Sequence, residues 1–302
     1  MAHRVRVGEL LLAIEGLALA RHLFGGDPTM AERRLDGMRH TLAALDAASP
    51  DGVDDPGRNP ADDPVEAVTV ELSEADIAEG YERWSASYDE AENPLLTVEE
   101  RILRSLITDV GLGTALDACT GTGRHARLLQ QLGHEVTGID QSPHMLELAR
   151  MKVPGASFIE ADLRIPGPTL ADASFDLVVC ALALTHFESL SEPIAALAGL
   201  TRRGGRIVLT DMHPMAVILS GQALFNDERD GRTRFVRNYV HQVSDYLEAF
   251  AAAGLVVHRC VEHVLTPGEG PMANLAGHLR PEATAAAYVG MPYVLAWSLD
   301  NP

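Results

Sequence analysis

The chain has 302 residues, 46% of them apolar, and its 43 acidic side chains against 24 lysines and arginines give a formal net charge of −19. This length allows one large domain with a core plus an appendage, and the charge disfavours nucleic acid as a partner because it repels phosphate backbones. Three widely spaced cysteines argue against a disulfide framework, and no apolar run is long enough to span a bilayer, so we expect a cytoplasmic protein without a membrane segment.

Two amphipathic helices and a linker are predicted at the start of the chain. Apolar residues recur at helical spacing in two runs that begin at Val7 and Leu35. The next stretch is rich in proline and aspartate and cannot build a core. We therefore expect a helical hairpin over residues 1–48, an acidic linker over 49–65 and a catalytic domain over 66–302. The hairpin must bury its stripes against the catalytic domain or a second subunit, and we favour a homodimer.

Order is expected to return after the linker with a short helix that follows Ser73 to Asp76. Its residues form an aromatic and apolar face made of Ile77, Tyr81, Trp84 and Tyr88. Such a face either packs into the core or covers a ligand. The sequence from Thr97 to Glu100 is expected to cap the next helix.

The most informative segment runs from Thr114 to Gly123, where a short apolar strand leads into a glycine-containing loop and a helix. A second strand ends at Asp140, a third at Asp162 and a fifth at Asp211. The fourth strand lies within residues 175–187. Strands alternating with helices predict a parallel sheet, and the carboxyl ends of such strands form a binding site for a nucleoside-bearing cofactor.

The glycine pattern alone does not identify that cofactor. Gly121 to Ala126 also fits the dinucleotide fingerprint G-x-G-x-x-G/A, with Asp140 near the position of the ribose acid. An NAD(P)-dependent oxidoreductase is therefore an alternative at this point. Such an enzyme is expected to contain a Tyr-x-x-x-Lys proton relay, and no lysine stands four residues after Tyr81, Tyr88, Tyr239 or Tyr246.

An insertion over about residues 212–241 is expected to roof the substrate. Asp227 to Gly231 has the composition of a hairpin turn within it. Residues 255–264 and 293–299 read as closing strands, which complete a mostly parallel sheet with an antiparallel edge.

The ordered series of strands and acids resembles the class I S-adenosylmethionine (SAM) methyltransferases over about residues 75–265, especially the small-molecule branch that includes the ubiquinone/menaquinone-type enzymes. The first motif of that family is close to Leu-Asp-x-Gly-Cys-Gly-Thr-Gly. Asp117, Gly121 and Gly123 match it, whereas Cys119 stands where the first glycine is expected and leaves a less open turn. The resemblance implies a doubly wound α/β fold with a seven-stranded, mostly parallel, Rossmann-like sheet.

The resemblance also implies S-adenosyl-L-methionine as cofactor and a set of residues that bind it. In this family the acid matching Asp140 grips both ribose hydroxyls, and the acid matching Asp162 contacts the adenine amino group. The residues matching Ala181 and Leu182 meet the methionine part. The expected cofactor contacts are Tyr88, Asp117, Ala118, Cys119, Gly121, Gly123, Asp140, Gln141, Met145, Asp162, Leu163, Ala181 and Leu182.

Methyl transfer is an in-line displacement that requires positioning, and a base only if the attacking atom is protonated. Three histidines on the predicted substrate side are catalytic candidates: His186, His213 and His241. A packed or capping role is the alternative for each of them. We expect no metal site, because no His/Cys pair has ligand spacing.

We therefore expect a methyltransferase that acts on a small molecule at oxygen, with nitrogen and carbon open. The alternatives are a SAM-binding enzyme that catalyses a non-methyl reaction, the NAD(P) oxidoreductase, and a non-catalytic interaction module on the same fold.

Overall fold

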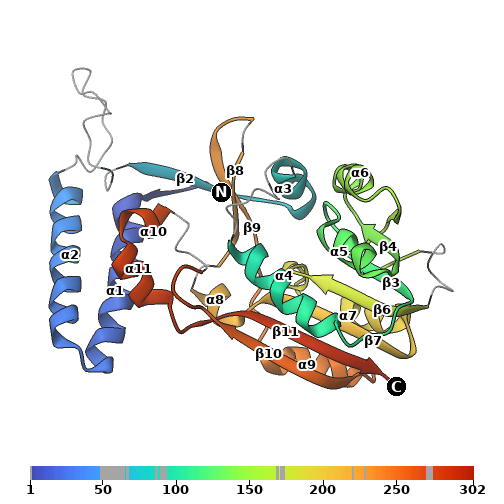
Figure 1. The fold of residues 1–302 in the computed structure, drawn as a ribbon. Helices are drawn as coiled ribbons and strands as arrows, with labels where there is room; N and C mark the ends of the chain where they lie inside the picture. Colours follow the sequence, from blue (N-terminus) through green and yellow to red (C-terminus); the bar gives the residue numbers. More distant parts are fainter. Residues whose placement is uncertain are drawn as a thin grey trace. The chain divides into compact units, whose positions relative to one another are not determined.

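The computed structural model describes residues 2–47, 65, 68–85, 88, 94–167, 170, 174–219, 221–227, 229–269 and 275–302. The expected acidic linker therefore lies almost wholly outside the described residues. The chain forms two compact units (Figure 1). One contains Met1–Glu74 with Leu265–Met291, and the other contains Ala75–Val264 with Pro292–Pro302.

The second unit contains the predicted seven-stranded sheet. Six of its strands point in the same direction, and β11 runs against them, antiparallel to β7 and to β10. The strand order is β10-β11-β7-β6-β3-β4-β5. The strands are β3 (Thr114–Ala118), β4 (Glu135–Asp140), β5 (Ser157–Glu160), β6 (Phe175–Ala181), β7 (Thr201–Met212), β10 (Val256–Val264) and β11 (Pro292–Asn301).

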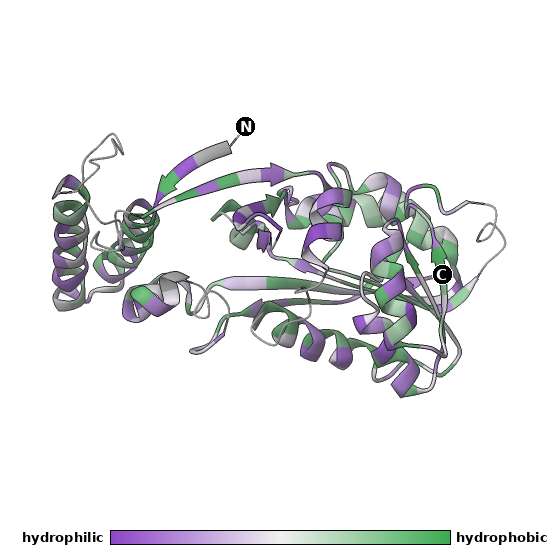
Figure 2. Cartoon of the chain, turned by 90° about the horizontal axis from the view of Figure 1, so that it is seen from above, coloured by the Kyte–Doolittle hydropathy of each residue, from purple (hydrophilic) through white to green (hydrophobic). Residues whose placement is uncertain are grey.

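Side chains that alternate along each strand fill two cores, one on each face of the sheet. On β6, Val178 and Cys180 belong to the core under α7 (Ser191–Leu200) and α9 (Val243–Ala252). Val179 belongs to the opposite core, under α4 (Pro94–Ile107) and α5 (Arg124–Leu132). Figure 1 shows helices on both faces, and in Figure 2 the flanking helices alternate between hydrophobic and hydrophilic segments. The doubly wound fold predicted from the sequence is confirmed.

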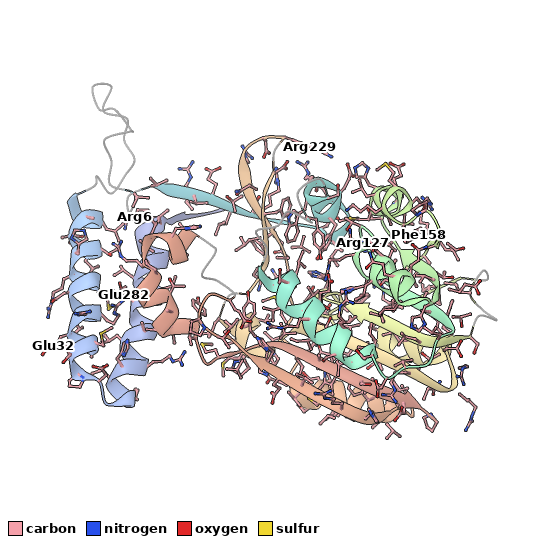
Figure 3. All side chains as sticks on the ribbon, in the orientation of Figure 1. Arg6, Glu32, Arg127, Phe158, Arg229 and Glu282 are labelled. Atoms are coloured by element: carbon pink, nitrogen blue, oxygen red, sulfur yellow. The ribbon has the colours of Figure 1, made fainter. Side chains whose placement is uncertain are left out.

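A short helix before the sheet and a hairpin within the insertion were expected, and both are present; we refer to them as the lid helix and the roof hairpin. Helix α3 (Ile77–Trp84) begins after Asp76, whose side chain accepts a hydrogen bond from the Glu79 backbone N–H at 2.9 Å. The insertion contains α8 (Pro214–Ile218) and the antiparallel strands β8 (Ala223–Asp227) and β9 (Arg232–Val236). The predicted turn between Asp227 and Gly231 is therefore confirmed, and Figure 3 labels Arg229 within it.

The start of α4 differs from the prediction. The helix begins at Pro94, one turn before the expected cap at Thr97. Proline suits the first turn of a helix because its missing N–H would lack a partner there. Glu99 therefore lies inside the helix, where its side chain is fully buried.

The first unit contains α1 (Val7–Gly25), α2 (Pro28–Ala47), α10 (Leu275–Leu279) and α11 (Pro281–Tyr288), with β1 (Ala2–Arg6) paired antiparallel to β2 (Thr69–Ala75). The predicted helical hairpin is therefore joined by residues 265–291, which the sequence placed in the catalytic domain. Small side chains allow α11 to approach α1 closely, since Ala18, Ala283 and Ala287 form a common core.

Polar contacts reinforce that packing. The two terminal nitrogens of Arg21 donate to the backbone carbonyls of Ala287 and Val289, each at 2.7 Å. The buried Arg34 pairs with Glu15 at 3.4 Å and with Glu282 on α11 at 3.2 Å. Figure 3 labels Glu282. Among the described helices, none combines the length and the apolar character needed to cross a bilayer.

Candidate cofactor and acceptor site

The loop that follows β3 turns sharply through residues in the left-handed backbone region. Cys119, Gly121 and Gly123 have φ values of 57°, 54° and 83°. A Cβ atom on Gly123 would lie 3.1 Å from the Cα of Ala149 on α6 (Pro143–Lys152), so glycine is required for this close packing. A Cβ on Gly121 would meet nothing within 4 Å. The loop therefore packs against α6 at Gly123, whereas the backbone at Gly121 remains uncovered.

Cys119 adopts the left-handed conformation that the usual glycine would adopt freely. A non-glycine residue in this region costs about 1–2 kcal/mol, and such strain concentrates at functional sites. Leu182, just after β6, has a φ of 53° and carries the same kind of strain. The sequence predicted a less open turn at Cys119. In the structure Cys119 keeps the left-handed backbone conformation that suits glycine, and its side chain places a thiol at the turn. A hydrogen bond with this thiol, together with burial, raises the pKa of the Cys180 thiol.

Asp117 anchors the loop from inside the sheet. Its side chain is buried, and Thr120 Oγ1 donates a hydrogen bond to Asp117 Oδ2 at 2.5 Å. Burial raises the pKa of Asp117. Asp117 and the adjacent Ala118, which is also fully buried, therefore shape the loop from below.

Asp140 stands at the end of β4, beside the open glycine. Its Oδ2 accepts the backbone N–H of Gly121 at 2.9 Å, and its Oδ1 accepts the backbone N–H of Ser142 at 2.9 Å. Burial raises the pKa of this carboxyl, and hydrogen bonds from the backbone of Ser142, Gly121 and Gln141 act against that rise. A carboxylate has about four lone-pair sites, so an ionised Asp140 keeps capacity to accept a hydrogen bond next to an uncovered backbone. This fits a ribose hydroxyl of a nucleoside.

Asp162 follows β5 and is held by a neighbouring arginine. Arg164 donates to its carboxylate through Nε at 3.1 Å and through Nη2 at 2.6 Å. The side-chain hydrogen bond from Arg164 lowers the pKa of Asp162. Among the other expected contacts, Leu163 and Met145 are buried and Gln141 is exposed.

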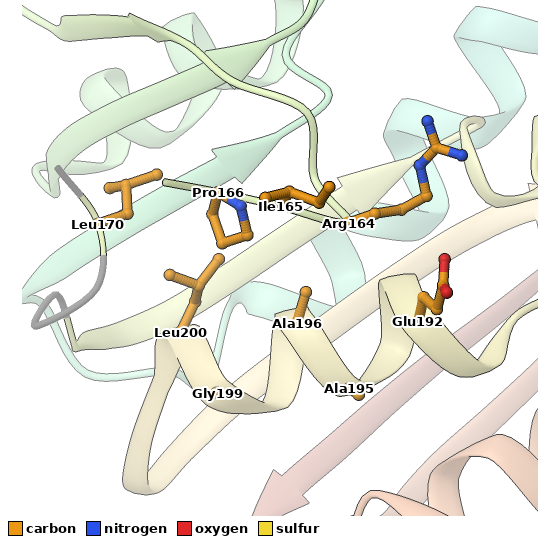
Figure 4. Close-up of a pocket in the computed structure, with 9 residues that line it drawn as sticks. All are labelled: Arg164, Ile165, Pro166, Leu170, Glu192, Ala195, Ala196, Gly199 and Leu200. Atoms are coloured by element: carbon orange, nitrogen blue, oxygen red, sulfur yellow. The ribbon is translucent and has the colours of Figure 1, made fainter. Parts of the chain in front are cut away.

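A separate groove opens on the far side of Arg164 (Figure 4). It lies between α7 and the segment after β5 and has a volume of about 670 Å³. Its lining residues are Arg164, Ile165, Pro166, Leu170, Glu192, Ala195, Ala196, Gly199 and Leu200. None of the residues expected to bind the cofactor lines it, so this groove is not the predicted site.

A buried ionic cluster beneath the glycine loop was missed by the sequence reasoning. Glu99 accepts a hydrogen bond from Thr210 Oγ1 at 2.6 Å, and its Oε2 lies 2.8 Å from Arg124 Nη2 and 3.1 Å from His125 Nε2. Burial alone would raise the pKa of Glu99. The charges and hydrogen bonds of these neighbours outweigh burial, and the pKa is lowered to about 2. Arg124 and His125 directly follow Gly123, so the cluster ties the loop to α4.

His186 ends the short helix Leu184–His186 after β6 and is buried. Its Nδ1 lies 2.9 Å from the backbone carbonyl of Arg237, and its Nε2 lies 2.5 Å from Tyr81 Oη. Burial lowers the pKa of His186. The imidazole is therefore neutral near pH 7 and points its two nitrogens at the roof segment and the lid helix.

The other two candidate histidines are also buried and bonded. His213 caps α8: its Nδ1 accepts the Met215 backbone N–H at 3.1 Å, and its Nε2 lies 2.9 Å from Glu262 Oε1. His241 Nε2 donates to the backbone carbonyl of Phe187 at 2.7 Å. Both ring nitrogens of His213 therefore have hydrogen-bond partners within the protein.

Asp211, the acid that ends the fifth predicted strand, points into the core. Tyr246 Oη donates to Asp211 Oδ2 at 3.0 Å. Burial raises the pKa of Asp211 to about 7, although the hydrogen bonds from Tyr246 and Thr185 act against the rise. This carboxyl therefore belongs to the packing under α9.

The lid helix and Tyr88 form a cluster of aromatic rings, although α3 ends at Trp84 and Tyr88 lies beyond the helix on which the sequence placed it. Tyr81 stacks on Trp84 with ring centroids 5.8 Å apart, and Tyr88 lies 5.9 Å from Tyr81 and 5.1 Å from Trp84. Trp84 also stacks on Phe225 of β8 at 5.5 Å. The lid is therefore packed against the roof hairpin.

An ion-pair cluster fastens the same two elements. The buried Asp227 accepts hydrogen bonds from Arg83 Nη1 on α3 at 2.6 Å and from Arg234 Nε on β9 at 2.8 Å. Burial raises the pKa of Asp227, but Arg83, the Arg229 backbone and Arg234 together lower it to about 2.

Comparison with known proteins identifies the family. Residues 116–209 match the family described as "Methyltransferase domain". The malonyl-[acyl-carrier protein] O-methyltransferase of Pectobacterium atrosepticum is 31% identical over 178 residues, which cover 59% of this chain and 68% of that protein. The demethylmenaquinone methyltransferase of Deinococcus radiodurans is 40% identical over 114 residues, which cover 35% of this chain and 46% of that protein.

A solved structure described as "DhpI-SAM-HEP complex" shares the fold with a TM-score of 0.52. It is 19% identical in sequence, and the match covers 73% of this chain and 94% of that one. The matched stretches thus span about two thirds of the first curated relative and about half of the second. The family match, the relatives and the shared fold agree with the site built from β3, β4 and their loops. The chain belongs to the class I SAM-dependent methyltransferases, in the small-molecule branch that includes the ubiquinone/menaquinone-type enzymes, and its cofactor is S-adenosyl-L-methionine.

Proposed function

We propose that the enzyme transfers the methyl group of SAM to a hydroxyl oxygen of a small molecule. The observation that carries this proposal is the state of His186. Its Nδ1 faces a carbonyl and must carry the proton, so its Nε2 holds a lone pair, and burial keeps the ring neutral. A neutral imidazole at the end of β6 is the base that a protonated oxygen acceptor requires. An amine acceptor already has a free lone pair and would not need one.

The binding roles we propose are those that the family resemblance implies. Asp140 accepts the ribose hydroxyls beside the open backbone of Gly121, and Asp162 with Leu163 lies at the adenine. Ala181 and Leu182 lie beside the methionine part, and Tyr88 closes the site from the lid. SAM, when bound, supplies an electrophilic methyl group on a sulfonium. The remaining contacts we propose are Asp117, Ala118, Cys119, Gly123, Gln141 and Met145.

The name of one relative supports the acceptor atom. The Pectobacterium protein is named an O-methyltransferase. We propose oxygen here as well, with His186 as the base and with His213 and His241 as parts of the walls of the acceptor pocket.

The test uses SAM with a labelled methyl group and a panel of small hydroxyl, carboxylate and amine compounds. We expect the label on a hydroxyl oxygen, with S-adenosylhomocysteine released in equal amount, as read by mass spectrometry and NMR. Label found only on nitrogen or carbon would overturn the oxygen assignment.

A site variant provides the control for that test. Hydrogen bonds to a charged group contribute about 1.5–3 kcal/mol each, so Asp140→Ala should weaken SAM binding at least tenfold in calorimetry. Unchanged affinity would show that Asp140 does not bind the cofactor.

We also propose that the chain forms a homodimer through the N-terminal helices. The inner face of α1 is covered within its own unit, because Leu11 and Ala18 are buried. Leu35 and Leu42 on α2 remain 37% and 46% exposed and offer an apolar surface to a second copy. We expect light scattering at micromolar concentration to give a dimer for the intact chain and a monomer for the Leu35→Glu/Leu42→Glu variant. A monomeric intact chain would exclude the dimer.

A further inference from the structure

The hydrogen bonds around His186 fix where each proton lies. The carbonyl of Arg237 can only accept, so Nδ1 of His186 donates to it at 2.9 Å. Nε2 of the neutral ring can then only accept, and the group in front of it is Tyr81 Oη at 2.5 Å. The hydroxyl of Tyr81 therefore donates its proton to Nε2. The lone pair of the base is covered by a tyrosine, and an acceptor molecule cannot reach it directly.

The segment that holds His186 is itself fixed. The backbone N–H of Tyr239 donates to the carbonyl of Thr185 at 2.6 Å, and His241 Nε2 donates to the carbonyl of Phe187 at 2.7 Å. These bonds join the return segment of the roof to the residues on both sides of His186. The imidazole has little freedom to turn its Nε2 away from Tyr81.

Tyr81 lies beside Tyr88, an expected cofactor contact, with ring centroids 5.9 Å apart. Burial raises the pKa of the Tyr81 hydroxyl, and interactions with Tyr88 and Asp140 raise it further. The Tyr81 side chain is half-buried. Its oxygen donates one hydrogen bond and keeps lone pairs that can accept another.

We propose that Tyr81 is a catalytic residue that contacts the acceptor hydroxyl and relays its proton to His186. This inference rests on the proposed function. Tyr81 accepts a hydrogen bond from the acceptor O–H while it donates its own to Nε2 of His186, so the three groups form one chain.

The bonds made and broken balance along that chain. The acceptor O–H bond breaks, its proton goes to Tyr81 Oη, and the proton of Tyr81 goes to His186 Nε2. The electron pair freed on the acceptor oxygen forms the bond to the methyl carbon, and the pair that bound that carbon to sulfur stays on sulfur as a neutral thioether. His186 becomes an imidazolium and returns its proton to water. No phenolate is formed, which suits a tyrosine in a buried position among negative charges.

The kinetic test compares Tyr81→Phe with Tyr246→Phe on ring-substituted phenols of graded acidity. Each change removes one tyrosine hydroxyl, and the hydroxyl of Tyr246 donates to Asp211 in the core. We expect Tyr81→Phe to slow turnover about 10²-fold on the least acidic phenols, the lower end of general acid–base effects. The loss should vanish for phenols that are already ionised. Tyr246→Phe should change stability without this dependence on acceptor acidity.

The second readout needs no turnover. In the ¹⁵N spectrum of histidine-labelled enzyme, His186 should show a protonated Nδ1 and an unprotonated, hydrogen-bonded Nε2. Tyr81→Phe should move the Nε2 resonance toward that of a free imidazole nitrogen and raise the midpoint of His186 titration, because the bond from Tyr81 favours the neutral ring. SAM affinity measured by calorimetry should change less than threefold.

The outcomes separate the two proposals. If the intact enzyme methylates phenols and Tyr81→Phe is equally fast on all of them, the relay is wrong and the proposed function stands. If Nε2 is protonated in the intact enzyme, the relay is also wrong. If no hydroxyl compound is methylated, both proposals fail together.

Discussion

Replacing Glu99 by alanine is expected to lower the free energy of unfolding by about 3–5 kcal/mol, the usual result of removing one partner from a buried ion pair. The side chain is fully buried and serves Thr210, Arg124 and His125 at once. Arg124 is only 12% exposed, so the variant would leave its charge poorly solvated and poorly paired. Urea unfolding followed by circular dichroism measures the loss.

The adjacent Glu100 provides the matched control. It pairs with Arg104 one turn further along α4 at 3.6 Å and reaches the edge of the Glu99 cluster at Arg124 Nη1, 3.8 Å away, but its side chain is 36% exposed. Exposed pairs of this kind contribute about 0–1 kcal/mol, so Glu100→Ala should unfold close to the parent. Equal losses for the two variants would contradict the role given to Glu99.

The contribution of Glu99 also has a defined pH range. Its pKa is about 2 in the folded protein and 4.5 when unperturbed. The folded state therefore binds fewer protons than the unfolded state between these values, so the contribution is complete above pH 4.5 and is lost as the pH falls toward 2. The stability difference between the parent and Glu99→Gln should shrink over this range.

Replacing His186 by asparagine is expected to reduce turnover of a hydroxyl acceptor by about 10²–10⁴-fold, the usual contribution of a general base. Asparagine can still donate to the Arg237 carbonyl, so the variant removes the basic nitrogen while it keeps the anchoring bond. SAM affinity should barely change. Turnover at several pH values between 6 and 9, with the melting temperature as a check on folding, measures the effect.

His213→Asn tests the rival candidate. Both nitrogens of His213 are engaged, with the Met215 backbone and with Glu262. We therefore expect lower stability and turnover within a few-fold of the parent. Near-normal turnover in both histidine variants would mean that the enzyme acts by positioning alone, and a large loss in His213→Asn alone would move the base to the end of β7.

The sequence predicts the parts of the site that depend on residues close together in the chain. A strand that ends in an acid or runs into a glycine loop is visible in consecutive residues, and this order is enough to expect Asp140 and Gly121 at the same edge of the sheet, where they form a hydrogen bond. The parts that it misses depend on residues far apart in sequence. Tyr81 and His186 are separated by 105 positions, and Glu99 and Thr210 by 111.

Two predicted boundaries were wrong: the start of α4 and the extent of the helical unit. Thr97 has the pattern of a helix cap, but Pro94 provides a favourable first turn earlier and the helix starts there. Residues 265–291 begin with the Pro/Gly-rich stretch 266–271, which marks a break in the chain but does not say which unit the following helices join. Their packing on α1 through Ala283 and Ala287 and the bonds from Arg21 and Arg34 assign them to the helical unit. Neither choice can be made from a single segment.

The cluster around Asp227 has a kinetic consequence. If α3 parted from the β8–β9 hairpin, Asp227 would keep Arg234 and lose Arg83, so the parted state is disfavoured by the loss of one partner of a buried carboxylate. The helix proposed to cover the cofactor and the hairpin proposed to cover the acceptor are therefore expected to move together. One opening rate then sets a common upper limit for admission of the acceptor and for exchange of the spent cofactor.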